Sequence, residues 1–132
     1  MSPAAEKQLL QVVMLLVLLV PLAGSLIGIA RGPEGFDRAA SGITLDSHFR
    51  YLSGLLLAMT LLFASCVPAI ERRGARLRLI AVLPITGGLA RLLSLVVAGR
   101  PGEAHLAALF IELGVVPLVL LWQARLARRF PA

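Results

Sequence analysis

The sequence predicts an all-α integral membrane protein, a bundle of four transmembrane helices with both chain ends on the cytoplasmic side. Two observations predict this fold class. Apolar residues make up 58% of the 132 residues and the mean hydropathy is +0.89, whereas soluble domains contain roughly 45–50% apolar residues. The apolar residues also gather in four windows, each close to the roughly 20 residues that a helix needs to cross a bilayer.

The four windows follow one another along the chain and are separated by short connections. They cover residues 8–29, 49–70, 79–98 and 105–123. Too few residues lie outside them for a soluble domain, so residues 1–132 are expected to form one transmembrane domain. The first window is longer than the roughly 7–15 apolar residues of a signal peptide core. We therefore expect it to be a true membrane span.

The basic residues predict the orientation. Four spans place both chain ends and the middle connection on one side of the membrane. That side carries eight basic residues, namely Lys7, Arg72, Arg73, Arg76, Arg78, Arg125, Arg128 and Arg129. The other side carries four, namely Arg31, Arg38, Arg50 and Arg100. Because Lys and Arg are enriched in cytoplasmic connections, the termini are expected in the cytoplasm and the protein in a bacterial inner membrane.

The net charge of +6 indicates membrane lipid rather than nucleic acid as the partner. The charges lie in short clusters between apolar windows, with few aromatic residues, which is not the pattern of a nucleic-acid surface. The seven arginines on the cytoplasmic side are expected to face anionic lipid head groups. Binding to nucleic acid is therefore not predicted.

Motifs for catalysis and for metal binding are missing from the sequence. Cys66 is the single cysteine, which excludes a disulfide within the chain and a multi-cysteine metal site. Nothing resembles a nucleophile motif, a metal signature or a phosphate-binding loop, so no catalytic residue, metal or cofactor is predicted. Binding of a lipid, a quinone or a pigment stays an open alternative.

Small residues and turn formers predict local features of the helices. Small residues that let helix backbones approach each other are expected at Gly24, Gly28, Gly54, Ala58, Gly87 and Gly88. They predict packing within the bundle or, alternatively, a homodimer contact. Pro21, Pro84 and Pro117 lie within spans and predict kinks. Asp46 or Ser47 is expected to cap the second span.

Two charged residues lie within the apolar windows of the third and fourth spans. Arg91 and Glu112 are each about ten and a half residues from the turn centred between Pro101 and Gly102. Antiparallel neighbours then have both side chains at one depth, about 10–12 Å below the periplasmic end at 1.5 Å per residue. A charge in the bilayer usually pairs or lines a cavity. The sequence predicts an intramembrane ion pair, which serves as a structural lock, as the polar floor of a pocket or as a relay for protons or ions.

Helical spacing gathers further polar and small residues near the periplasmic side of this pair. The candidate lining of an intrahelical cleft there consists of Arg50, Tyr51, Ser94, His105, Ala108 and Ser25. Clefts between bundle helices with a few polar groups are common ligand sites. The alternative is that Arg50 and Tyr51 only anchor a span at the interface, and that His105 only starts a helix at the water boundary.

Several phrases of the sequence resemble a known family. They are FRYLSGL at 49–55, GGLARLLS at 87–94, GRP at 99–101, and Glu112-Leu113 before Pro117. Together they resemble the bacterial family called domain of unknown function 4345, small four-helix inner-membrane proteins. The resemblance covers most of the chain from Asp46 onward. It implies the four-helix fold and a polar signature of Arg50, Arg91 and Glu112, and it implies no reaction.

The sequence is compatible with three functions. The first is a non-catalytic accessory subunit of a larger membrane complex, or a protein that binds a lipid-, quinone- or pigment-like amphiphile. The second is a proton-linked or small-molecule transporter that uses the Arg91–Glu112 pair, although the spans offer mainly Thr86 and Gln123 as polar residues toward the cytoplasm. The third is a membrane-embedded enzyme with Glu112 and His105 as acid and base.

Overall fold

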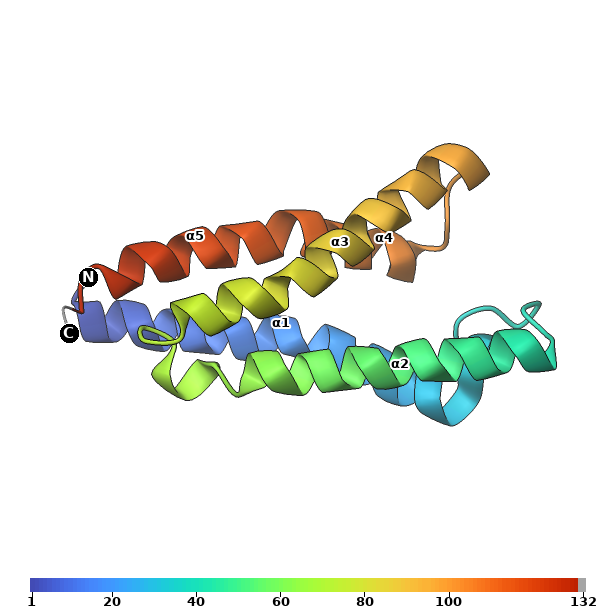
Figure 1. The fold of residues 1–132 in the computed structure, drawn as a ribbon, viewed down its shortest axis with the longest axis horizontal. Helices are drawn as coiled ribbons and strands as arrows, with labels where there is room; N and C mark the ends of the chain where they lie inside the picture. The colour runs from blue at the N-terminus through green and yellow to red at the C-terminus, as the bar shows by residue number, and fades with distance from the viewer. Residues whose placement is uncertain (131–132) are drawn as a thin grey trace. The chain divides into compact units, whose positions relative to one another are not determined.

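The computed structural model describes residues 1–130 and shows an all-helical chain, with no strand among these residues. Five α-helices and three short helical segments of other types follow one another (Figure 1). The α-helices are α1 (Pro3–Arg31), α2 (Ile43–Ala64), α3 (Gly74–Ala98), α4 (Glu103–Phe110) and α5 (Val116–Ala127). The 3-10 segments are η1 (Gly32–Gly35) and η2 (Val67–Ala69), and the π-helical segment η3 (Ile111–Val115) joins α4 to α5.

Among residues 1–130, four helical runs are long and apolar enough to cross a membrane, which confirms the all-α fold with four candidate spans and indicates a multi-pass membrane protein. They run over Pro3–Gly35, Ile43–Ala69, Gly74–Ala98 and Glu103–Ala127, with window hydropathies of 2.0 to 2.7. All four begin earlier than the apolar windows of the sequence, because residues outside the apolar runs, such as Glu6 and Arg78, continue the helix. Hydropathy reports the length of the apolar run, whereas the helix ends where backbone hydrogen bonding ends.

The start of α2 differs from the prediction. The helix begins at Ile43 with Gly42 before it, at a φ of 121°. The prediction that Asp46 or Ser47 caps this helix is therefore wrong. Asp46 lies in the first turn instead, and its carboxylate accepts a hydrogen bond from Arg50 Nε at 2.8 Å. A carboxylate in the first turn is favourable because it faces the positive end of the helix dipole.

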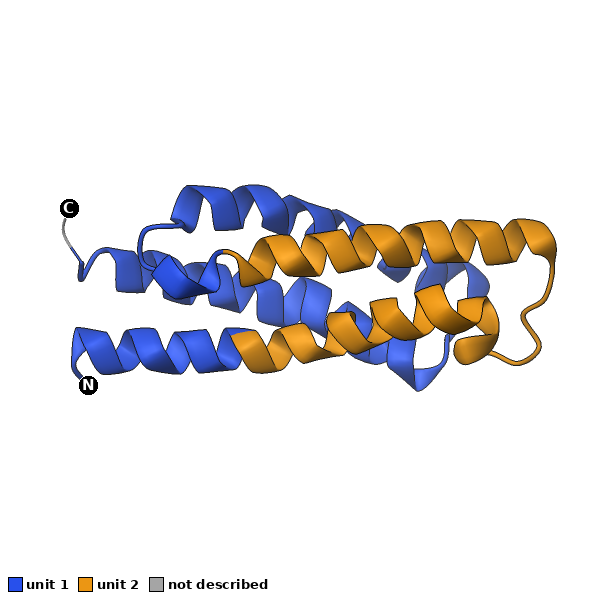
Figure 2. Cartoon of the chain, turned by 90° about the horizontal axis from the view of Figure 1, so that it is seen from below, with its two compact units in different colours: residues 1–14, 66–132 blue, residues 15–65 orange. Residues whose placement is uncertain are grey.

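The chain divides into two compact units, coloured separately in Figure 2. Unit 1 contains Met1–Met14 and Cys66–Ala132, and unit 2 contains Leu15–Ser65. The buried apolar residues of unit 1 are Leu10, Met14, Cys66, Val67, Ile70, Leu77, Ile80, Ala81, Val119 and Leu126. One buried polar side chain of unit 1 is satisfied by a direct bond. The Gln123 amide, 1% exposed, donates to the Ile70 carbonyl at 2.9 Å.

Unit 2 consists of the second part of α1, η1, the following loop and α2. Gly28 of α1 lies so close to α2 that a Cβ at this position would meet Ser53 Oγ at 2.2 Å. Gly28 therefore allows the close helix approach that small residues predict. Gly24 and Gly54 have no neighbour within 4 Å of a Cβ built on them, and Ala58 is exposed. Within the described residues, no close helix approach occurs at these three positions, and the alternative of a homodimer contact there stays a prediction.

The π-helical segment η3 has a direct cause in Pro117. Proline has no N–H to donate to the carbonyl four residues earlier, here Leu113, and its ring excludes that carbonyl from the normal α-helical position. A wider turn immediately before the proline accommodates the carbonyl. Pro21 and Pro84, by contrast, lie inside α1 and α3, which continue through them. The strongest local irregularity of the fourth span therefore falls at Glu112.

Candidate functional site

A polar cluster of three side chains lies within unit 1, where α3 packs against α4 and η3. It consists of Arg91, His105 and Glu112 and is called the Arg91 cluster below. The Arg91 guanidinium lies on the Glu112 carboxylate in a two-point contact, with Nε 3.0 Å from Oε2 and the second terminal nitrogen 3.2 Å from Oε1. Its other terminal nitrogen lies 2.9 Å from His105 Nδ1. His105, predicted only as a candidate cleft residue, thus joins the predicted Arg91–Glu112 pair around one guanidinium.

The Arg91 contact defines the role of one His105 nitrogen. A guanidinium has only donors, so Nδ1 of His105 is the acceptor in this contact. The guanidinium has five N–H donors, and the contacts with Glu112 and His105 use three of them. Two N–H groups of Arg91 thus have no acceptor among residues 1–130.

The cluster is only partly covered by protein. The Arg91 side chain is 30% exposed and the Glu112 side chain is 17% exposed. The helix that carries Glu112 is also the least covered span, because only 6% of its apolar window is buried, against 22–28% for the other three. Part of the Arg91 and Glu112 side chains is therefore left uncovered by the rest of the chain.

Gly88 sets the distance between α3 and η3. A Cβ at Gly88 would lie 2.9 Å from Glu112 Cβ and 2.8 Å from Leu113 Cδ2. Gly88 therefore lets the backbone of α3 approach η3, and this approach brings Arg91, one turn further along α3, onto Glu112. Gly87 is exposed and has open space around a built Cβ. The predicted packing role thus falls to Gly88 and not to Gly87.

The other predicted cleft residues fall into both units. In unit 1, Ser94 is exposed and Ala108 is half-buried. In unit 2, Tyr51 is 62% exposed, and Ser25 is fully buried and donates to the Leu22 carbonyl at 2.9 Å. Arg50 donates to Asp46 and to the Ile29 carbonyl. The single cleft that would contain all of these residues stays a prediction.

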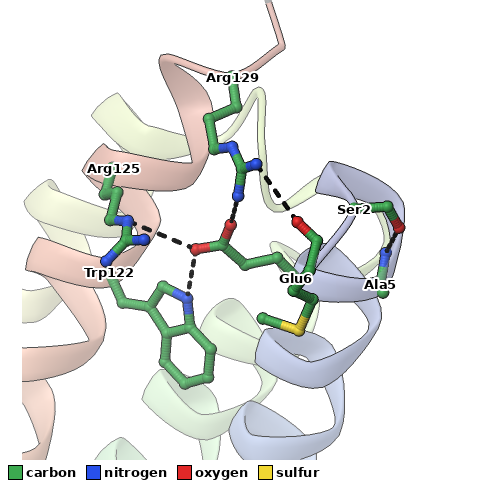
Figure 3. A network of polar contacts seen from close by, with 7 residues as sticks. Ser2, Ala5, Glu6, Trp122, Arg125 and Arg129 are labelled. Atoms are coloured by element: carbon green, nitrogen blue, oxygen red, sulfur yellow. Dashed lines mark hydrogen bonds and ion pairs between the residues drawn. The ribbon is translucent and has the colours of Figure 1, made fainter.

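A second polar cluster, which the sequence did not predict, is centred on Glu6 of α1 within unit 1 (Figure 3). The Glu6 side chain is 3% exposed. It accepts a hydrogen bond from Trp122 Nε1 at 3.2 Å and one from Arg129, and Arg125 Nε lies 3.7 Å away. Arg129 also donates to the Met1 carbonyl. This cluster joins the first turns of α1 to the end of α5.

One sequence signal could have found the Glu6 cluster. An even number of spans places both chain ends on one side, and Glu6 is the only acidic residue before the first apolar window. Arg125 and Arg129 were expected to face lipid head groups. Both form ion pairs with Glu6. Arg72, with its side chain 86% exposed, is open to the surroundings.

Lys7 of α1 forms an ion pair with Glu71 in the connection before α3, with Nζ 3.0 Å from Glu71 Oε2. The Glu71 side chain is 9% exposed. Burial raises the pKa of the Glu71 carboxyl, but the Lys7 ammonium and the residue's own backbone amide outweigh burial, so that its pKa lies below the usual value. The pair fixes the first helix to the connection before α3.

A sequence model of the family described as Domain of unknown function (DUF4345) matches residues 9–123. The chain belongs to the DUF4345 family. No curated protein and no solved structure matches it. The part that matches DUF4345 contains Arg91, His105 and Glu112 in full, whereas Glu6, Arg125 and Arg129 lie outside it. The Arg91 cluster is thus built entirely from residues of the DUF4345 match.

The described residues of this DUF4345 chain were compared with the ligand sets that metal ions need. No group of three or more His, Cys, Asp or Glu side chains that could hold a metal ion occurs among residues 1–130. The Arg91 cluster offers one carboxylate and one imidazole, and Nδ1 of that imidazole already faces the Arg91 guanidinium. The cluster can donate hydrogen bonds from the Arg91 guanidinium, which Glu112 and His105 hold in place.

Proposed function

We propose that this chain is a non-catalytic protein of the bacterial inner membrane that binds an amphiphile at the Arg91 cluster, either alone or as an accessory subunit of a larger membrane complex. The termini are placed in the cytoplasm on the grounds of the eight basic residues on that side. The amphiphile has an oxygen acceptor at its polar end, as a quinone, an oxygen-bearing pigment or a lipid has.

The observation that carries the proposal is the pair of unused N–H groups on Arg91. Hydrocarbon has no acceptor for them, and an unsatisfied polar group in lipid costs several kcal/mol. A structural lock would be complete when every donor is used or covered, but Arg91 is 30% exposed. An oxygen atom of a ligand supplies the acceptor, and Glu112 and His105 hold the guanidinium in place for it.

The surface beside the cluster suits an apolar tail. Phe110, Leu118 and Leu121 of the same span are 70%, 65% and 69% exposed. They offer apolar contact along the helix that carries Glu112. A ligand bound there would be presented on the outside of the chain, which is where a larger complex could use it.

Transport is less well supported. A pathway for protons or ions needs polar groups that continue from Glu112 toward the cytoplasm, and Gln123 is the main polar residue there on the fourth span. Its amide is buried and already donated to the Ile70 carbonyl. That hydrogen bond ties Gln123 to packing, so the polar group is not available to a moving ion.

The first experiment is native mass spectrometry of the protein extracted gently from its own membrane, with an absorbance spectrum of the same sample. We expect a bound small molecule of defined mass, or a defined partner subunit that carries it. A chain that appears only as a bare monomer without a chromophore, and that takes up no added quinone or lipid, would refute the proposal.

A charge-swapped variant separates ligand binding from the structural lock. Exchanging the two charges in Arg91→Glu with Glu112→Arg keeps an ion pair between α3 and η3 but moves the guanidinium to the other helix. We expect stability close to that of the wild type and loss of the bound molecule. A swapped variant that keeps the ligand would contradict a role for Arg91 in binding. The exposed pair Arg100–Glu103, swapped in the same way, is the matched control.

A further inference from the structure

A cavity with unpaired charges lies in unit 2, where the chain leaves α1. Its volume is about 480 Å³, and it is lined by Arg31, Glu34, Gly35 and Arg38. This size falls within the roughly 300–1,000 Å³ of small-molecule sites. All three charged residues are exposed. The cavity is separate from the Arg91 cluster, and none of its residues belongs to the function proposed above.

The charges around the cavity differ from the other arginines on the same predicted side of the membrane. Arg50 pairs with Asp46 at 2.8 Å, and Arg100 pairs with Glu103 at 2.8 Å. Within residues 1–130, Arg31, Arg38 and Glu34 form no ion pair within 4.0 Å, although all three line one cavity. Two cations and one anion thus stay apart from each other around a common space.

The backbone holds this arrangement in place. Gly32 has a φ of 64°, which turns the chain at the end of α1, and Pro33 follows it as the second residue of η1. A Cβ at Gly35 would lie 2.9 Å from Ile27 Cγ2 and 3.1 Å from Arg31 Cβ. The absence of a side chain at Gly35 therefore lets the loop fold back against the stem of Arg31.

Asp37, the remaining acidic residue of the loop, forms a hydrogen bond with the backbone of the loop. Its Oδ1 accepts a hydrogen bond from the Ala39 amide at 2.9 Å, in a turn that the Asp37 carbonyl continues to Ala40. Asp37 thus shapes the loop before Arg38 and leaves Glu34 as the carboxylate at the cavity.

We propose that this cavity binds the phosphoethanolamine head group of a membrane phospholipid. The cavity follows the apolar part of a helix long enough to cross a bilayer, so it lies at the level where head groups are found. Arg31 and Arg38 contact the phosphate, because guanidinium groups donate charge-assisted hydrogen bonds to phosphate oxygens. Glu34 accepts hydrogen bonds from the ammonium group.

The charge pattern discriminates between head groups. A phosphoglycerol head group satisfies the two arginines but leaves Glu34 beside an added anion and without a cation. A phosphocholine head group has a quaternary ammonium without N–H donors, so Glu34 receives no hydrogen bond. The phosphoethanolamine head group carries both a phosphate and a donor cation, and it alone among the three complements all three side chains.

The test is native mass spectrometry of the full chain in detergent, titrated with phosphatidylethanolamine, phosphatidylglycerol or phosphatidylcholine of the same acyl chains. We expect phosphatidylethanolamine to bind most tightly. Arg31→Gln with Arg38→Gln should weaken its binding roughly tenfold or more, because charge-assisted hydrogen bonds are lost. Glu34→Gln should remove the preference over phosphatidylglycerol. Arg100→Gln with Glu103→Gln, which breaks an exposed pair outside the cavity, should change neither.

Three results would overturn the proposal. The first is equal binding of the three lipids by the wild-type chain, and the second is unchanged binding by the double arginine variant. The third comes from soluble O-phosphoethanolamine, which has the head group without acyl chains. If it displaces the lipid at equal concentration, the site serves a free phosphate compound and not a lipid. We expect no displacement, because the acyl chains hold the lipid at the apolar end of α1. Circular dichroism of each variant checks that the helices persist.

Discussion

Gly88 and Glu112 approach so closely that a Cβ at Gly88 would lie 2.9 Å from the Cβ of Glu112. The contact joins α3 to the π-helical turn and fixes the distance across which the Arg91 side chain reaches its partner. The backbone of Gly88 therefore matters as much for the polar cluster as the charged groups themselves.

Replacing Gly88 by alanine should push α3 and η3 apart. Overpacking of a tight contact costs roughly 1–3 kcal/mol, and we expect a loss of that size in the free energy of unfolding, measured by titration with a denaturing detergent. Gly87→Ala is the matched control, because the neighbouring position has open space around it. Equal effects of the two substitutions would contradict the packing seen here.

Replacing Glu112 by glutamine should destabilise the chain by roughly 1–3 kcal/mol, because it leaves the Arg91 charge without a counter-ion in an apolar span. The same detergent titration measures the effect. Glu103→Gln is the control, since its ion pair with Arg100 is 71% and 83% exposed, and such pairs contribute less than about 1 kcal/mol. A smaller loss for Glu112→Gln than for Glu103→Gln would show that Arg91 finds another partner.

Replacing Glu6 by glutamine should loosen the contact between the start of α1 and the end of α5. The chain has one tryptophan, and Trp122 donates to Glu6, so its fluorescence reports on this cluster directly. We expect a change in the emission maximum and faster amide hydrogen exchange in residues 3–10. Glu34→Gln, a change in unit 2, should leave the emission unaltered, and an unchanged spectrum of the Glu6 variant would count against the cluster.

The Lys7–Glu71 pair predicts a loss of stability in acid. The pKa of Glu71 is lowered in the folded chain, while an unfolded glutamate has a pKa near ~4.3. The folded state therefore binds the proton less readily, so that the stabilisation is present above the unfolded pKa and is lost as the pH falls through the folded pKa. Glu71→Gln should flatten the decline in unfolding free energy between neutral pH and acid. A variant with the slope of the wild type would show that other carboxylates cause it.

The sequence was sufficient for the number and type of the spans, because lipid selects long apolar runs regardless of how helices pack. Counting residues from the turn was also sufficient to expect Arg91 and Glu112 at one depth. The sequence did not distinguish which of Gly87 and Gly88 faces η3, since a shift of one residue rotates the helix face by about 100°. The Glu6 cluster and the start of α2 were missed for a related reason, because they depend on side-chain directions and on backbone hydrogen bonds that hydropathy does not report.

The wide turn at Ile111–Val115 has a consequence for how the fourth span tolerates insertions and deletions. A π-helical turn holds one residue more than an α-helical turn, so the helix before it and the helix after it are set in phase by a single residue. Deleting one residue from this turn would convert it to a regular α-helical turn and keep the two flanking helices in phase, whereas deleting one residue from α4 or α5 would rotate one part of the span against the other by about 100°. The fourth span should therefore tolerate the loss of one residue in this turn better than the loss of one residue elsewhere.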